Sequence, residues 1–75
     1  MTDVTLKKAW ADGNAQLKSV GIKEAALDSW YLLEWATGVS KARYYMEPDK
    51  MLSKEEYQKY QNGLNKRSQR IPLQH

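Results

Sequence analysis

The chain has 75 residues, of which 41% are hydrophobic, and it contains 3 Trp, 5 Tyr and no Cys. A chain of this length forms one domain at most, and the absence of cysteine excludes disulfide bonds and cysteine-ligated zinc. The formal net charge is +3, and no apolar run approaches the roughly 18 residues of a membrane span. We therefore expect a single domain, residues 1–75, stabilised by packed apolar side chains.

The first predicted helix begins after Thr5, whose hydroxyl is suited to cap the N-terminal amides. Gly13 and Asn14 each weaken its middle by about 1 kcal/mol or less relative to Ala, so the helix could break there. Gly21 should end it, because glycine adopts the left-handed conformation without a steric penalty. Its apolar residues recur at helical spacing and are Leu6, Ala9, Trp10, Leu17 and Val20.

The second predicted helix runs from about Lys23 to Thr37 and ends at Gly38. Its apolar residues cover more than one narrow stripe, which is typical of a central helix that neighbours contact from several sides. These residues are Ala26, Leu27, Trp30, Tyr31, Leu32 and Leu33.

A short third helix is predicted from its cap at Ser40 to about Met46, and Pro48 ends it because the residue before a proline avoids the helical region. We expect its inner side to consist of Ala42, Tyr45 and Met46.

The fourth predicted helix begins with a capping box, in which Ser53 and Glu56 satisfy each other's backbone amides. Leu52 and Tyr57 are spaced as a hydrophobic staple across this start. The helix should close near residue 70, shortly before Pro72. Its apolar stripe is Tyr57, Tyr60 and Leu64. Without any useful β alternation, the sequence predicts an all-α bundle of four helices, or five if the first one breaks.

No catalytic constellation is visible. The single histidine, His75, is the last residue, and without a second histidine or a cysteine no positioned nucleophile and base can be assembled. The four glycines are isolated, which excludes a glycine-rich phosphate loop. We therefore expect no catalytic, cofactor-binding or metal-binding residue in this segment. Glu24 and Asp28 share a helix face, either as a weak acidic patch or, more simply, as acids that favour the helix dipole.

The positive charge lies in the last third of the chain, where residues 54–75 carry five basic and two acidic side chains. The cluster Lys66, Arg67 and Arg70 either stabilises a helix C-terminus or docks an acidic partner or another domain. Arg67 lies one turn beyond Leu64, so we expect its guanidinium to be half-buried, where geometry and pairing matter. Trp35 is a candidate partner contact, because Trp30 and Trp35 point to different sides of one helix and one of them should be partly exposed.

Taken in order, these segments resemble the N-terminal domain of the HemK/PrmC family of peptide chain release factor glutamine methyltransferases. The resemblance rests on Gly21–Ser29, the leucine-containing helix that ends at Gly38, the Ser40–Asp49 segment, the Leu52–Glu56 helix start and the ending Pro72-Leu73-Gln74-His75. No single motif is specific, and the ordered combination carries the resemblance.

The resemblance implies a helical bundle that recognises a class I release factor for methylation of its Gly-Gly-Gln loop. In the family, S-adenosylmethionine and an Asn-Pro-Pro-Tyr motif belong to a following catalytic domain. This chain contains no Asn-Pro pair, so no catalysis is expected from this segment alone. The implied partners are the release factor and the chain's own catalytic domain, in the cytoplasm and without membrane contact.

Two other functions remain open from the residues alone. The first is a free-standing basic module that binds nucleic acid, although the basic groups are few and no recognition-helix pattern is evident. The second is a small adaptor that dimerises through exposed tryptophans.

Overall fold

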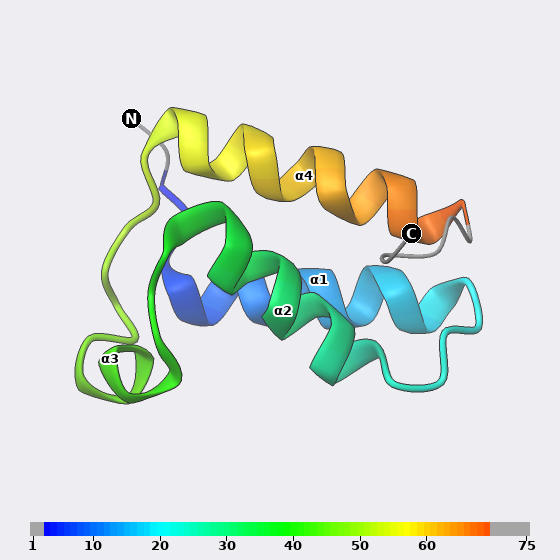
Figure 1. Cartoon of the computed structure of the whole chain (residues 1–75), viewed down its shortest axis with the longest axis horizontal. Helices are drawn as coiled ribbons and strands as arrows, with labels where there is room; N and C mark the ends of the chain where they lie inside the picture. Colours follow the sequence, from blue (N-terminus) through cyan, green and yellow to red (C-terminus); the bar gives the residue numbers. More distant parts are fainter. Residues whose placement is uncertain (1–2, 70–75) are drawn as a thin grey trace.

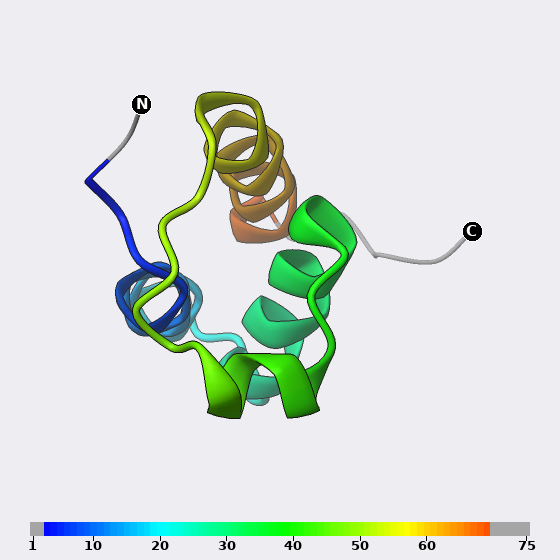
Figure 2. The same ribbon diagram turned by 90° about the vertical axis from the view of Figure 1, so that its left-hand side faces the viewer.

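The computed structural model describes residues 3–69, which form an all-α bundle as predicted. The three longer helices contact one another pairwise, and the short helix lies at the end of the bundle where the first helix begins (Figures 1 and 2). No helix within residues 3–69 is long and apolar enough to cross a membrane. The helices are α1 (Leu6–Ser19), α2 (Ala25–Thr37), α3 (Lys41–Met46) and α4 (Lys54–Ser68).

The core lies between α1, α2 and α4. Leu17, Leu33, Tyr60 and Leu64 are completely inaccessible to solvent, and each comes from one of these three helices. Every buried side-chain nitrogen or oxygen atom in the described part of the chain has a hydrogen-bond partner. A domain this small therefore combines a continuous apolar centre with fully satisfied polar groups, as its limited core requires.

Gly13 does not break α1, so the bundle has four helices within the described range rather than five. A methyl group added at Gly13 would clash with the hydroxyl oxygen of Tyr60. That hydroxyl donates a hydrogen bond to the carbonyl of Ala9, at 2.9 Å. The glycine thus makes a notch that admits the Tyr60 ring end, and packing against α4 outweighs its poor helix propensity.

The start of α1 is fixed by the loop that precedes α4. The amides of Leu6 and Lys7 donate to the carbonyls of Lys50 and Pro48, at 2.9 and 3.0 Å. Thr5 caps the helix as predicted, accepting from the amide of Lys8. Amides at a helix start have no partner within the helix, so these contacts satisfy them and join two distant segments.

Two glycines end helices in the left-handed conformation, as predicted. Gly21 has φ +84°, and its amide and that of Ile22 donate to the carbonyls of Lys18 and Leu17. This pair of bonds is a Schellman motif. Gly38 has φ +73° and follows α2. The start of α2 differs from the prediction, because residues 23 and 24 form a turn and the helix begins at Ala25.

The inner side of α3 was predicted wrongly. Tyr44 is its buried residue, whereas Tyr45 and Met46 are 69% and 78% exposed and Ala42 is also exposed. A helix of six residues offers less than two turns of periodicity. Its inner face is therefore decided by what it packs on, which here is an aromatic pair from α1 and α2.

The start of α4 agrees with the prediction in detail. Both bonds of the capping box between Ser53 and Glu56 are present. Leu52 is buried and Tyr57 packs against the core, as a hydrophobic staple requires. The helix ends at Ser68 with Gln69 as its cap, close to the predicted end near residue 70, whereas Pro72 itself lies outside the described residues.

Candidate functional site

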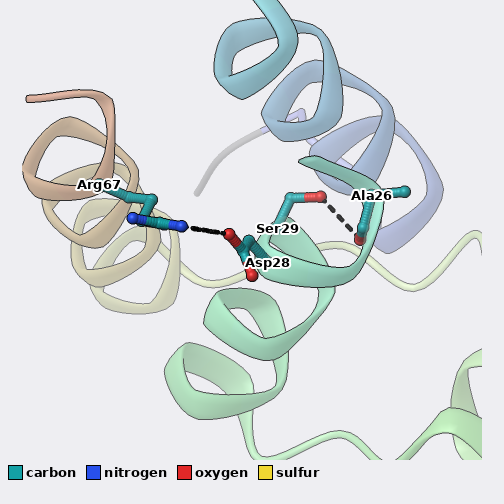
Figure 3. Close-up of polar contacts among 4 residues, drawn as sticks. All are labelled: Ala26, Asp28, Ser29 and Arg67. Atoms are coloured by element: carbon teal, nitrogen blue, oxygen red, sulfur yellow. Dashed lines mark hydrogen bonds and ion pairs between the residues drawn. The ribbon is translucent and has the colours of Figure 1, made fainter. Parts of the chain in front are cut away.

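The predicted basic docking cluster is divided by the structure. Lys66 is exposed on α4, whereas Arg67 pairs within the domain. Its Nε and Nη2 atoms donate to Oδ2 of Asp28, at 3.0 and 2.8 Å (Figure 3). Arg70, the third member of the cluster, lies outside the described residues. The docking role of these three residues stays a prediction.

The pair between Arg67 and Asp28 is half-buried, as we expected for Arg67. The side chains retain 25% and 16% of their exposure, so water screens this ion pair less than a fully exposed one. Asp28 is in the first turn of α2 and Arg67 in the last turn of α4, positions where each charge also favours its own helix dipole. The pair therefore joins the end of α4 to the start of α2.

The proposed acidic patch of Glu24 and Asp28 has a simpler explanation. Asp28 is neutralised by Arg67, and Glu24 precedes α2 without making a side-chain cap. No group of three or more acidic, histidine or cysteine side chains that could hold a metal ion is found within residues 3–69. Beside the pair, Ser29 is fully buried and donates to the carbonyl of Ala26, which ties its hydroxyl to its own helix (Figure 3).

The end of α4 is also attached to α1. The side-chain amide of Gln16 donates to Ser68 Oγ, at 3.0 Å, and to Asn65 Oδ1, at 3.3 Å. Since Arg67 holds the same turn to α2, both neighbouring helices fix the C-terminal turn of α4. Sequence reasoning missed these contacts because their partners are 39 to 52 residues apart.

The tryptophans separate into an inner group and an exposed residue. Trp30 is 4% exposed and Trp35 is 55% exposed, which confirms that one of the two faces solvent. Trp10, expected in the core, is partly buried against it, and its Nε1 donates to the carbonyl of Ala26. Trp10, Trp30 and Tyr44 form a cluster with ring centroids 5.2 to 5.4 Å apart.

Trp35 is held in place although it is exposed. The Nζ atom of Lys59 lies 4.5 Å from the centroid of its ring, within the range of a cation–π contact. The ring also lies against Gly63 of α4, since a methyl group added there would come within 3.4 Å of Trp35 Cζ3. The indole therefore packs on the backbone of α4 at this position, and the side chain that a methyl group at Gly63 would crowd is that of Leu32, at 2.9 Å.

Two further apolar side chains of α2 face outward beside Trp35. Leu27 and Tyr31 are 41% and 53% exposed, so α1 and α4, which contact α2 from several sides as expected, leave this part of its apolar surface uncovered. Leu27, Tyr31 and Trp35 follow one another at intervals of four residues, so they form one stripe along the helix. We name these three residues the outer stripe. The spacing of four residues was a signal for this stripe in the sequence. It was not recognised because the helix contains other apolar residues between these positions.

The comparisons with known proteins agree on one family. The model of the family described as PrmC N-terminal domain matches residues 8–75. A release factor glutamine methyltransferase from Caulobacter vibrioides is 33% identical over 72 residues, which are 96% of this chain and 25% of the relative. The chain thus spans about a quarter of the length of this curated relative. No solved structure matches the chain.

Proposed function

The chain belongs to the PrmC N-terminal domain family, and from this membership we propose that it recognises the protein substrate of a release factor glutamine methyltransferase. The substrate would be a class I peptide chain release factor, methylated on the glutamine of its Gly-Gly-Gln loop. The observation that carries the proposal is the similarity of nearly the whole chain to a relative named release factor glutamine methyltransferase.

The proposal assigns methyl transfer to a separate catalytic domain of the same protein. Residues 3–69 contain helices and one isolated β-bridge, and they offer no strand followed by a glycine-rich turn, the kind of element that cradles a nucleotide-like cofactor. Binding of S-adenosylmethionine is therefore proposed for that other domain only. A remote binding surface can still raise the rate of methyl transfer, because it supplies orientation to the reacting groups.

The firmly anchored end of α4 suits this arrangement. A domain that follows α4 would be attached to a turn held by Arg67 on one side and Gln16 on the other. Such an attachment restricts how far the catalytic centre can rotate relative to the recognition surface, which helps to keep a bound substrate oriented for reaction. We place the complete protein in the cytoplasm, where translation termination takes place.

A titration of the chain with a purified class I release factor tests the proposal. Tryptophan fluorescence at two salt concentrations is a suitable signal, because Trp35 is exposed and lies beside Lys59. We expect saturable binding, either by the chain itself or by a version extended through a methyltransferase domain. Failure of both to bind would contradict the proposed function.

The same chain titrated with a DNA duplex tests the nucleic-acid alternative. Binding that contacts several phosphates weakens steeply as salt increases. If the duplex bound more tightly than the release factor, with such a slope, the nucleic-acid alternative would replace the proposal.

A further inference from the structure

We propose that the outer stripe of α2, together with the lysines on the adjoining flank of α4, binds an amphipathic helix of the release factor whose apolar side is bordered by carboxylates. This inference rests on the proposed function and assigns that function to one face of the bundle. In Figure 1, α2 lies in front of α1 and below α4, and among the described residues no further helix lies in front of it.

The exposure of the outer stripe sets it apart from the other apolar residues of α2. Leu27, Tyr31 and Trp35 are 41% to 55% exposed, whereas the inward-facing Trp30, Leu32 and Leu33 are 6% exposed or less. Tyrosine and tryptophan are also the residues most enriched among those that dominate binding energy in protein interfaces. A continuous apolar row with two such aromatics is therefore better explained by a partner than by folding.

The shape of the outer stripe fits a helix as its partner. Eight residues separate Leu27 from Trp35, and at 1.5 Å per residue the row is about 12 Å long. An apolar row of this length and width matches the apolar face of two to three turns of an amphipathic helix. Neighbouring residues along it are four apart, so they can interdigitate with similarly spaced residues on the partner.

Trp35 is positioned for binding before a partner arrives. Its ring rests on Gly63, and Lys59 lies 4.5 Å above it. An aromatic side chain that is already held loses little conformational freedom when it is buried, which favours affinity. More than half of Trp35 stays accessible to a partner, as its 55% exposure shows.

The charges beside the outer stripe define the partner's chemistry. Lys59 and Lys66 are seven residues apart on α4, so they lie on the same flank of that helix, and both are exposed. The nearby Arg67 is neutralised by Asp28, which leaves these two lysines as the basic border. Glu34 is exposed on the other border of the stripe, three residues after Tyr31. Carboxylates on the partner should therefore align along the α4 side.

The test compares substitutions on this face with matched substitutions elsewhere, using titration with a purified class I release factor. Tyr31→Ala and Trp35→Ala are each expected to weaken binding about tenfold or more, the loss typical of a central aromatic contact. The matched control is Tyr45→Ala, because Tyr45 is 69% exposed on α3. It should change the affinity by about twofold or less, as expected outside the contact.

A second pair of variants tests the basic border. Lys66→Glu should weaken binding several-fold at low salt and less at high salt, since ions screen exposed charges. Lys7→Glu on α1 changes the net charge equally and should have a much smaller effect. Trp35→Phe should keep most of the affinity while removing the fluorescence change, because it preserves the aromatic contact.

The outcomes separate this inference from the proposed function. Circular dichroism of each variant must first show the helical content of the unsubstituted chain, and Tyr31→Ala with its control Tyr45→Ala decides the test if Trp35→Ala unfolds. Unchanged binding by the folded Tyr31→Ala and Trp35→Ala variants would overturn the inference and leave the proposed function intact. Absence of binding by the unsubstituted chain, alone and joined to its methyltransferase domain, would overturn both. A dimer of the chain that these variants abolish, without any effect on release-factor binding, would assign the stripe to a second copy and overturn the inference.

Discussion

Two regions of the bundle combine tryptophan with lysine, and they differ in what covers them. In the inner region, Trp10 and Trp30 pack beneath α3, and Lys41 of that helix lies 4.8 and 4.9 Å from their rings. In the outer region, Lys59 of α4 lies over Trp35 of α2, and no other helix within residues 3–69 covers the pair. A tryptophan with a lysine over its ring therefore stabilises the fold where a third helix covers the pair. Where no such helix covers it, the pair forms an accessible surface.

The largest expected effect separates the two tryptophans of α2. Trp30→Ala should lower the free energy of unfolding by about 3–5 kcal/mol, the usual cost of truncating a buried aromatic. Trp35→Ala should cost about 1 kcal/mol or less, because more than half of its side chain is already in solvent. Urea denaturation of the two variants measures the difference. Equal losses would contradict the division into an inner and an outer region.

A steric prediction concerns the closed side of the bundle, where Gly13 admits Tyr60. Gly13→Ala should destabilise the chain by about 1–3 kcal/mol through overpacking, although alanine is the better helix former. In a Tyr60→Phe background the cost should be smaller, since the atom nearest to the added methyl group is the Tyr60 hydroxyl oxygen. Thermal unfolding of the two single variants and the double variant gives the coupling energy. Additive effects would show that the notch is not specific to that hydroxyl.

The ion pair between Arg67 and Asp28 should have an intermediate effect. Arg67→Met should cost about 1–2 kcal/mol, between the values for exposed and fully buried pairs, because it leaves a half-buried carboxylate without its partner. Lys8→Met is the matched control, since Lys8 pairs with Asp12 and both side chains are more than half exposed. Chemical denaturation compares the two. If the control lost as much stability as Arg67→Met, the partial burial would have no energetic consequence.

The smallest effect concerns alkaline pH. Burial, with a smaller contribution from Asp12, raises the pKa of Tyr60 above its ordinary value of 10.0. The folded state therefore keeps this proton when the unfolded state loses it, so the stabilisation is complete below pH 10 and decreases as the pH rises further. We expect about 1 kcal/mol less stability at pH 11 than at pH 10 from this group. Tyr60→Phe should flatten the profile, and an equal slope in both chains would contradict the assignment.

Much of the fold could be predicted because its signals are local. Thr5, Ser40 and Ser53 each cap the helix that follows them, and Gly21 and Gly38 end helices in the left-handed conformation. Each of these roles depends on neighbours within four residues, so it can be read from the order of the side chains.

The errors concern contacts between distant segments. From the sequence, Gly13 indicates a weak point in α1, because nothing nearby shows why a side chain is missing there. The reason is Tyr60, 47 positions later, whose ring end fills the notch at Gly13. Tyr44 rather than Tyr45 faces inward because the two tryptophans below α3 select it. Arg67 was expected to be half-buried, but its partner Asp28 could not be identified from the sequence. Likewise, Leu27 and Tyr31 are apolar in sequence, and only the arrangement of α1 and α4 leaves them exposed.

The indole N–H signals of the three tryptophans test most directly whether the outer stripe of α2 binds the release factor. The chain is labelled with ¹⁵N, each signal is assigned with a single Trp→Phe variant, and a purified class I release factor is added. We predict that the Trp35 signal shifts or broadens well before those of Trp10 and Trp30. Binding that leaves the Trp35 signal unchanged would contradict the claim.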